Sequence, residues 1–227
     1  MDTLSIVIPV LNDALALTRL LECLRSLLSS EVAGATEIIV ADGGSSDEGR
    51  AVARRNGCVL VQGQASRGAQ LQRGFESSRG QWIWMLHADS IPEAEAVAWL
   101  VQPRAPGWGR FDVCFPGARP LLKLVATLMN WRSRRSGICT GDQGIFVHRS
   151  LLNLIGGVPT QSLMEDIELS KRLKREMAPL CPRLRLMASS RRWEHRGVVR
   201  TIVSMWWFRL RYWRGADPER LADEYYS

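Results

Sequence analysis

The sequence predicts an α/β fold in which a doubly wound, mostly parallel sheet is flanked by helices. Short, continuously apolar runs at 4–10 and 81–86 are typical of parallel strands that are buried on both faces. Stretches with helical spacing of leucines alternate with such runs through the first hundred residues. Glycine-containing turns separate the two kinds of segment, so the pattern indicates consecutive βα units.

The first hundred residues divide into four expected strands and three expected helices. Asn12 is expected to cap the first helix, which carries a stripe of leucines. Ser45 and Glu48 have the spacing of a capping box for the second helix, which is expected to end at Asn56 and Gly57. The strands are expected at 4–10, 37–41, 58–61 and 81–86, and the third helix at 66–78.

The regular alternation fades beyond about residue 100. The remaining elements are expected as a strand at 107–116, a helix at 121–131, a strand at 144–148, a helix at 162–177 and a helical segment at 197–226. We expect one domain, 1–227, made of a first half at 1–100, an irregular second half at 101–196 and a C-terminal helical extension at 197–227.

Length and composition set the class of protein. With 227 residues, 46% of them hydrophobic, the chain can bury the core of one large domain. Its five cysteines are odd in number and include no C-x-x-C pair, which argues against a disulfide framework or a zinc ribbon. The first residues lack the pattern of a signal peptide, and no apolar run reaches the length of a membrane span, so the cytoplasm is the expected compartment.

The net charge is +7, and every basic residue except Lys123, Lys171 and Lys174 is an arginine. Arginine suits phosphate oxygens, so an anionic partner is one explanation, and genomic base composition is an equally good one. The arginines are spread along the chain without a helix-turn-helix, RNP-like or zinc-finger pattern. We therefore expect no nucleic-acid partner.

An acidic turn, DGGSSDEG, follows the second expected strand and begins at Asp42. Helix punctuation would account for it without any ligand. The alternative is a nucleotide site, because open α/β sheets bind nucleotides where the carboxyl end of a parallel strand meets the start of a helix. The turn by itself leaves both explanations open.

A histidine and an aspartate follow the fourth expected strand in the run LHADS. His87 and Asp89 are expected on the same side of the chain, which is a spacing that metal ligands use. A carboxylate and an imidazole there could hold Mg²⁺ or Mn²⁺ against a diphosphate, and the imidazole favours Mn²⁺. A structural turn aspartate is the alternative.

The run SLMEDIELS contains a second pair of carboxylates. Ser162 and Glu165 have capping-box spacing, so the start of a helix largely accounts for Glu165. Asp166 has no such role, and the helix dipole favours its ionised form, as a general base for a hydroxyl requires. A simple first-turn charge is the alternative.

A basic run, SRRWEHR, precedes the C-terminal segment. Arg191 and Arg192 could neutralise a departing diphosphate, although exposed arginines more often form a solvated face. His195 could do the same or reach the metal, and a structural role is the commoner one for a lone histidine.

Seven motifs taken together resemble the family-two inverting glycosyltransferases of the GT-A fold, and more closely the compact bacterial branch labelled arsenosugar-biosynthesis-type. They are SIVIPVLN, ADGGSSD, RGAQLQRG, LHADS, TGDQGIFV, LMEDIELS and SRRW, and they cover essentially the whole chain in the family's order. The resemblance implies a nucleoside-diphosphate sugar donor, a hydroxyl acceptor and a divalent cation.

The resemblance also implies roles for particular residues. Those implied to bind the nucleotide sugar are Pro9, Leu11, Asp42, Arg67, Gln70, His87, Asp89, Arg191 and Arg192, with Asp42 contacting the base. Asp89 matches the last position of the family's D-x-D motif, Asp166 matches the catalytic base, and Asp142, Gln143 and Glu165 fall on the acceptor side. Two residues depart from the family pattern: His87 stands where an aspartate is usual, which puts strict metal dependence in doubt, and Gln72 stands where an asparagine is common.

The expected activity is inverting transfer of a sugar from a nucleoside-diphosphate sugar to an acceptor hydroxyl. Asp166 would be the base, and Asp89 with a metal would stabilise the leaving diphosphate. The alternatives are a nucleotide-sugar-binding protein without turnover and, more distantly, a nucleotidyltransferase. The product separates them, since nucleotidyl transfer releases pyrophosphate and binding alone releases nothing.

The tryptophan-rich segment at 197–214 is expected to form an amphipathic helix. Its basic face contains Arg200, Ser204, Arg211 and Arg214, and its apolar arc contains Val199, Ile202, Val203, Trp206, Leu210 and Trp213. We expect this arc to pack on the core and to wall an acceptor cleft that uses the charge of Arg209. Attachment to a membrane surface is the alternative, so at most weak membrane contact is expected.

Overall fold

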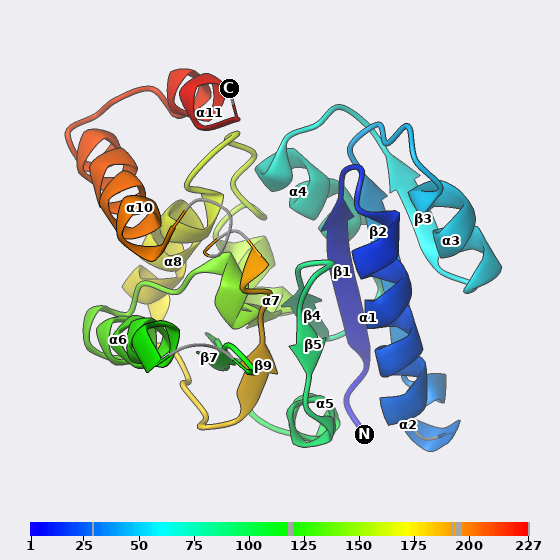
Figure 1. Cartoon of the computed structure of the whole chain (residues 1–227). Helices are drawn as coiled ribbons and strands as arrows, with labels where there is room; N and C mark the ends of the chain where they lie inside the picture. The colour runs from blue at the N-terminus through cyan, green and yellow to red at the C-terminus, as the bar shows by residue number, and fades with distance from the viewer. Residues whose placement is uncertain (29, 118–119, 192, 194–196, 227) are drawn as a thin grey trace.

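A six-stranded sheet forms the centre of the computed structural model, which describes all residues except 29, 118–119, 192, 194–196 and 227 (Figure 1). The strand order is β3-β2-β1-β4-β8-β6. β1 to β4 are parallel, β8 is antiparallel to β4, and β6 is antiparallel to β8. Their bounds are β1 Leu4–Val10, β2 Thr36–Asp42, β3 Val59–Gln62, β4 Trp82–Met85, β6 Trp108–Gly109 and β8 Phe146–His148. The prediction of a mostly parallel α/β sheet is confirmed.

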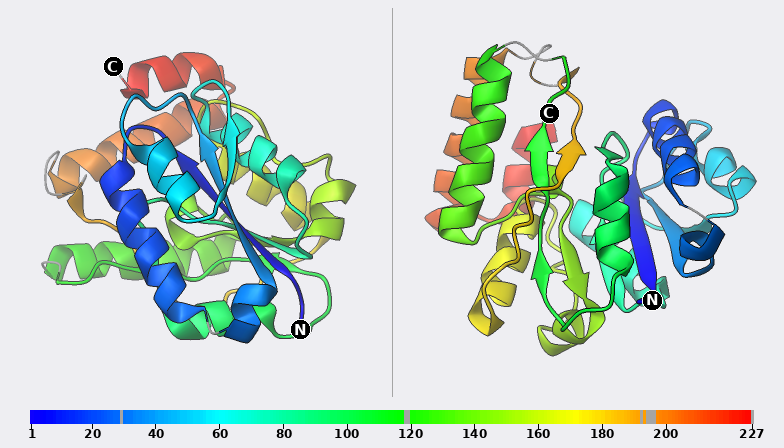
Figure 2. Two further views of the ribbon diagram at one scale, coloured as in Figure 1. Left: turned by 90° about the vertical axis from the view of Figure 1, so that its right-hand side faces the viewer. Right: turned by 90° about the horizontal axis from the view of Figure 1, so that it is seen from below.

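Helices cover both faces of this sheet. Successive side chains of β1 therefore alternate between two buried clusters, one on each face. Leu4, Ile6 and Ile8 pack against one set of helices, and Val7 packs against the other set. The first set is α1 Ala14–Leu27, α3 Gly49–Arg55 and α5 Ala94–Val101, and the second is α4 Arg67–Ser77, α7 Arg149–Leu154 and α8 Glu165–Glu176. The short helix α2 Ser30–Gly34 leads into β2. Figure 2 shows these layers from two further directions.

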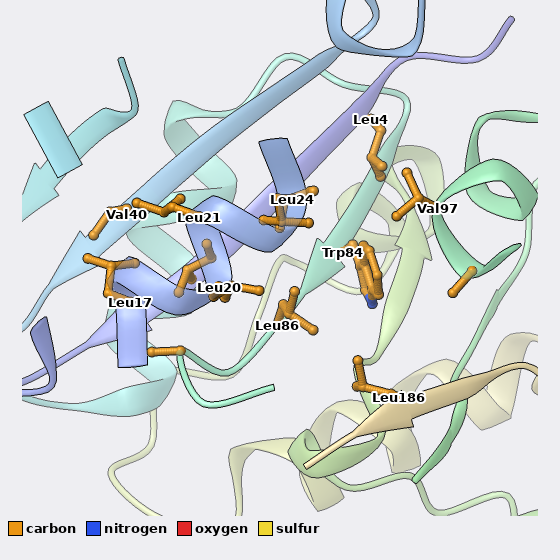
Figure 3. Packing of buried hydrophobic residues seen from close by; sticks show 14 of the residues in the cluster. Leu4, Leu17, Leu20, Leu21, Leu24, Val40, Trp84, Leu86, Val97 and Leu186 are labelled. Atoms are coloured by element: carbon orange, nitrogen blue, oxygen red, sulfur yellow. The ribbon is translucent and has the colours of Figure 1, made fainter. Parts of the chain in front are cut away.

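The buried core on the α1 side of the sheet contains residues from both halves of the chain. Figure 3 shows the leucines of α1 facing Val40 and Leu86, while Trp84 lies near Val97 and Leu186. Trp84 is fully buried, and its indole N–H donates to the carbonyl oxygen of Gly144 at 3.1 Å. The central strand β4 therefore anchors residues from both halves of the chain.

A second, three-stranded sheet lies beside the first, in the order β5-β9-β7. Its strands are β5 Ile91–Pro92, β7 Asp112–Cys114 and β9 Arg185–Met187. The helices α6 Pro120–Ser136 and α10 Val198–Trp213 pack together with β7, and α11 Pro218–Tyr226 ends the described chain. The single strand predicted at 107–116 is wrong, because β6 pairs with β8 whereas β7 pairs with β9.

Three expected helix caps are wrong. Asn12 adopts φ +51° and its side-chain oxygen accepts from the backbone N–H of Ser46, while the Asp47 carboxylate accepts from the N–H of Ala14 at the start of α1. α3 begins only at Gly49, so Ser45 and Glu48 do not form a capping box. α8 begins at Glu165 after Met164, which has φ +62°, so Ser162 caps nothing.

The C-terminal segment also differs from expectation in two respects. It forms two helices, separated around Gly215, which has φ +86°. Most of the apolar arc of α10 does not pack on the core, because Val199, Val203, Trp206, Leu210 and Trp213 are 40% to 81% exposed. Among the described residues, none of the helices combines the length and the apolar character that crossing a membrane requires.

Candidate active site

The loops that follow β1 and β2 are fastened to one another at the carboxyl edge of the sheet. The N–H of Asn12 donates to the Ser45 hydroxyl at 3.0 Å, and the N–H of Gly43 donates to the carbonyl of Val10 at 2.9 Å. Asp42 is only 1% exposed, and its carboxylate accepts from the N–H groups of Gly44 and Ser45 at 3.1 to 3.2 Å. The polar turn after β2 thus shapes two loops at once.

Other residues expected to bind the donor lie at the same edge. Leu11 is 47% exposed directly after β1, and Pro9 is half-buried near the end of that strand. Gln70 is buried, and its amide donates to the carbonyls of Val10 and Ala41 at 2.9 and 2.7 Å. Gln70 therefore holds the ends of β1 and β2 together, and its contact with a donor stays a prediction.

Arg67 connects the first half of the chain with the second. It lies at the start of α4, and its Nε is 3.0 Å from the Glu165 carboxylate at the start of α8. Its terminal nitrogen is 3.4 Å from Nδ1 of His87, which is itself 3.3 Å from the Asp142 carboxylate. A side chain on Gly141 would collide with both Arg67 and His87, so the glycine permits this close approach.

The carboxyl group of Glu165 is buried within this cluster, although the sequence assigned it to a helix cap. Burial raises its pKa to about 7, in spite of the lowering by the Arg67 guanidinium, and the Asp166 carboxylate adds to the rise. The 3.0 Å contact with Arg67 stabilises the ionised form of Glu165, which predominates once the pH exceeds the pKa of about 7.

Asp166 lies in the first turn of α8, as predicted, and backbone groups fix its carboxylate. Oδ1 accepts from the N–H of Ile167 at 2.7 Å, and Oδ2 accepts from the N–H of Gly141 at 3.0 Å. The side chain remains partly exposed and lines the pocket described below. Such a carboxylate is held in one orientation and stays accessible to a polar group of a ligand.

The two neighbouring acceptor-side predictions have different outcomes. Asp142, in the 3-10 turn η1 Gly141–Gln143, has a 39% exposed side chain beside His87. Gln143 is fully buried, and its amide donates to Asn130 and Ser133 of α6 at 3.1 and 3.0 Å. The structure therefore places Gln143 beneath the site, where it ties η1 to α6, and does not bring it to the surface.

Asp89 is paired with a residue outside this cluster. β4 ends at Met85, and the chain then turns, with the N–H of Ser90 donating to the carbonyl of His87 at 3.1 Å, so the strand geometry expected for His87 and Asp89 is wrong. The Asp89 carboxylate is 4.0 Å from Arg191, whose guanidinium also lies 3.2 Å from Asp13. Arg192 and His195 lie outside the described residues.

The fit of a divalent cation can be judged from these positions. Within the described part of the chain, no three side chains from histidine, cysteine, aspartate and glutamate converge as a ready-made metal site. Nε2 of His87 is buried without a hydrogen-bond partner there, and it faces the backbone of Gly141. Mg²⁺ and Mn²⁺ need only one or two carboxylates when a substrate diphosphate supplies further oxygens. The partly exposed Asp89 fits that requirement, and His87 in this orientation does not.

A pocket of about 100 Å³ opens where the two halves meet. Its lining includes the polar side chains Arg67, His87, Glu165 and Asp166, and α10 and α11 contribute Met205, Phe208, Arg209 and Tyr225. The sequence pointed to Arg209 but missed Met205, Phe208 and Tyr225, because their spacing in a helix does not distinguish a pocket wall from core packing. It also missed Asp13, which meets Arg191 from a distant part of the chain.

Residues 5–104 match the model of the family "Glycosyl transferase family 2". Among curated proteins, the chain is 35% identical over 115 residues to an undecaprenyl-phosphate 4-deoxy-4-formamido-L-arabinose transferase of Pseudomonas paraeruginosa, and 34% identical to its counterpart in Pseudomonas aeruginosa. These matches cover 47% of this chain and 34% of each relative, so the chain spans about a third of the length of the curated relatives it matches.

Solved structures resemble the fold over most of the chain. A mannosyltransferase from Pyrobaculum calidifontis, in complex with GDP-Man and Mn²⁺, aligns with a TM-score of 0.62 at 18% identity, covering 82% of this chain and 56% of its own. TarS from S. aureus, in complex with UDP-GlcNAc, gives 0.63 at 14% identity, covering 82% and 58%.

Glucosyl-3-phosphoglycerate synthase from Mycobacterium tuberculosis, in complex with Mn²⁺, UDP and its product, gives a TM-score of 0.54 at 21% identity, covering 81% of this chain and 70% of its own. At these identities the alignments establish the GT-A fold. The family match adds the sequence signature of family 2 glycosyl transferases over residues 5–104.

Proposed function

We propose that this protein transfers a sugar from a nucleoside-diphosphate sugar to an acceptor hydroxyl, with inversion at the anomeric carbon. The observation that carries the proposal is the position of Asp166. Its carboxylate is fixed by two backbone N–H groups, lines the pocket between the halves, and lies beside the Arg67–Glu165 pair. A fixed, accessible carboxylate next to a cation suits proton removal close to a departing anion.

In the proposed reaction, the acceptor oxygen attacks the anomeric carbon while Asp166 takes the hydroxyl proton. The bond between that carbon and the diphosphate oxygen breaks, and its electron pair leaves with the nucleoside diphosphate. Attack from the face opposite the leaving group inverts the anomeric configuration. Arg67 and Arg191, which lie at the carboxyl edge of the sheet, would offset the charge of the leaving diphosphate.

A divalent cation, Mn²⁺ or Mg²⁺, would be held by Asp89 together with the donor diphosphate, and when bound it would neutralise charge on the leaving group. The complexes of the structural neighbours with Mn²⁺ or Mg²⁺ are consistent with this role. Asp42, Pro9 and Leu11 would then contact the nucleoside, and Asp142 the acceptor. The exposed Leu11 supports its part in this assignment, whereas the Asp42 carboxylate would have to accept a further hydrogen bond.

The pocket also favours a second acceptor class. Arg209 lines the same pocket as Asp166, together with the apolar side chains Met205 and Phe208 of its own helix. A cation in an apolar wall fits the phosphate of a lipid-linked acceptor, and the names of the curated relatives mention undecaprenyl phosphate. A phosphate oxygen is already ionised and needs no base. In that case Asp166 would position the acceptor or the Gly141 turn without removing a proton.

Product analysis tests the proposal. The protein would be incubated with a panel of nucleoside-diphosphate sugars, and released nucleotides would be separated by chromatography with Mn²⁺, with Mg²⁺ and with excess chelator. Free nucleoside diphosphate, dependent on an acceptor and reduced in Asp89→Asn, is the expected result. Pyrophosphate would indicate nucleotidyl transfer, and a donor that stabilises the fold without any release would indicate a binding protein. We expect the reaction to take place in the cytoplasm, where nucleotide sugars are made available.

A further inference from the structure

Two helices of the second half leave apolar side chains exposed at one edge of the molecule. α6 and α10 lie side by side there (Figure 1 and the right-hand view of Figure 2) and share a buried cluster. Leu122, Val125 and Ala126 of α6 belong to this cluster, and Ile202 and Met205 of α10 pack against it. Each helix therefore packs one face against the rest of the protein and leaves another face exposed.

The outward face of α10 is a separate arc of the helix. Positions 201 and 208 are buried, while Val199, Val203, Trp206, Trp207, Leu210 and Trp213 are 40% to 81% exposed. At 100° per residue these six positions cover about a third of the circumference, roughly opposite the buried positions. Side chains of this size seldom stay in water as one contiguous group without a partner.

α6 presents a narrower stripe of the same kind. Leu121, Leu124, Leu128 and Trp131 are 46% to 61% exposed and recur at helical spacing on the side away from the buried Leu122 and Ala126. We call these four residues and the six of α10 the apolar outer face. Three of its ten members are tryptophans of one helix and a fourth is Trp131, which is the residue type that prefers the headgroup region of a bilayer.

The two helices of this face carry side-chain charges of one sign. Neither α6 nor α10 contains an aspartate or a glutamate, whereas α6 carries four basic residues and α10 carries three. Arg134 and Arg211 are ion-paired with Asp112 and Glu224. Lys123, Arg135 and Arg200 are exposed. A surface of tryptophan and leucine bordered by exposed cations complements an anionic membrane.

We propose that the apolar outer face attaches this protein to the surface of a membrane that contains anionic lipids. The tryptophans would enter the headgroup region, and the bordering cations would meet lipid phosphates. A second copy of the chain fits less well, because the exposed cations Lys123, Arg135 and Arg200 of one copy would face those of the other, and neither α6 nor α10 carries a carboxylate to pair with them. Attachment does not depend on the proposed function. Because Met205 and Phe208 of α10 also line the pocket, attachment through α10 would bring the pocket close to the lipid surface.

Vesicle flotation without any nucleotide or acceptor tests this inference. The protein would be mixed with vesicles of phosphatidylglycerol and phosphatidylcholine, and separately with vesicles of phosphatidylcholine alone. We expect binding to the anionic vesicles that weakens as salt increases. For the triple variant Trp131→Ser/Trp206→Ser/Trp213→Ser, we expect the partition coefficient calculated from the vesicle-bound fraction to fall by about tenfold or more. Thermal melting shows whether the variant is folded, and its midpoint should stay close to that of the parent because all three side chains are exposed.

The matched control is Leu15→Ser/Leu154→Ser, which removes two side chains that are 60% and 64% exposed on α1 and α7. This variant should bind vesicles like the parent. A second variant, Lys123→Glu/Arg200→Glu, should lose preference for anionic vesicles. Equal binding by the parent and the tryptophan variant would overturn the proposal. So would absence of vesicle binding combined with a dimer, measured by light scattering, that the tryptophan substitutions dissociate.

Discussion

The first hundred residues and the remainder of the chain build their parts of the candidate active site in different ways. In the first part, strands of four to seven residues lie parallel, and the loops at their carboxyl ends are joined by short contacts such as Gly43 to Val10. In the second part, the strands have two or three residues, and contacts between distant segments hold the site. Arg67 and Glu165, for example, are far apart in sequence.

This contrast has a physical consequence for the two proposed substrate sites. The carboxyl edge of this parallel sheet provides a rigid frame, because β1, β2 and β4 each have a hydrogen-bonded neighbour on both sides. The pocket between the halves is lined by helix starts, a 3-10 turn and the helices α10 and α11, none of which is part of a strand ladder. We infer that the carboxyl edge of the sheet, where the donor is proposed to bind, is more rigid than the pocket between the halves. The proposed catalysis then depends on how accurately the second part of the chain packs on the first.

The largest effect is expected at Asp166, the proposed base on the docked part. Asp166→Asn keeps an acceptor oxygen for the N–H of Gly141 but removes basicity, so kcat should fall by about a hundredfold or more while donor affinity stays nearly unchanged. Steady-state kinetics and donor titration measure the two quantities. Turnover that remains close to the parent value would favour an already ionised phosphate acceptor.

The next effect concerns Glu165, which lies buried at the junction of the two parts. Its folded-state pKa of about 7 exceeds the ordinary value of 4.5, so between these pH values the folded chain retains a proton that the unfolded chain has released. Stability should therefore decline as the pH rises from about 4.5 to about 7, by up to about 3 kcal/mol at roughly 1.4 kcal/mol per pH unit.

Glu165→Gln mimics the protonated form and should abolish this decline. Urea unfolding of both proteins at several pH values measures the difference: they should agree near pH 5, and the parent should be less stable relative to the variant at pH 8. If the parent instead gains stability with pH relative to the variant, pairing with Arg67 outweighs burial.

A third test acts on the packing between the two parts. Gly68, in the first turn of α4, lies against the backbone of 159–161, and a Cβ there would collide with the carbonyl oxygen of Pro159. Gly68→Ala should reduce the free energy of unfolding by about 2 to 3 kcal/mol, because backbone atoms cannot move aside as a flexible side chain can. Gly34→Ala is the control, since no atom lies within 4 Å of a Cβ at that position. Equal stability of the two variants would mean that the junction is adaptable.

The smallest effect is expected in the frame on the donor side. Asp47 accepts from the N–H of Ala14 at 2.8 Å and from the N–H of Gly49 at 2.9 Å, and thereby caps α1 and α3 together. Asp47→Ala should cost about 1 to 2 kcal/mol of unfolding free energy. Its neighbour Glu48 forms a loose ion pair with Arg55, at 3.8 Å, and both side chains are exposed. Glu48→Ala should therefore change stability by less than about 0.5 kcal/mol. Chemical denaturation distinguishes the two, and similar values would show that the cap contributes little.

The sequence determined the parallel part of the fold because its signals are local. The apolar run of β1 and the leucine stripe of α1 are periodic patterns, and burial of Leu17, Leu20 and Leu24 follows directly from them. The position of Asp166 in a first helical turn was predictable for the same reason. These elements are long enough for their own periodicity to decide which side chains face the core.

Only the tertiary structure decided which polar residues meet and which apolar residues remain exposed. Glu165 reads as a cap in the sequence, yet it is buried against Arg67, and Gln143 reads as a site residue, yet it is buried against α6. The apolar arc of α10 has the pattern of a core helix, yet Trp206 and Trp213 are 66% and 81% exposed. A helical pattern records that one face is apolar, but whether protein, lipid or a partner covers that face depends on how distant segments pack, which local periodicity does not encode.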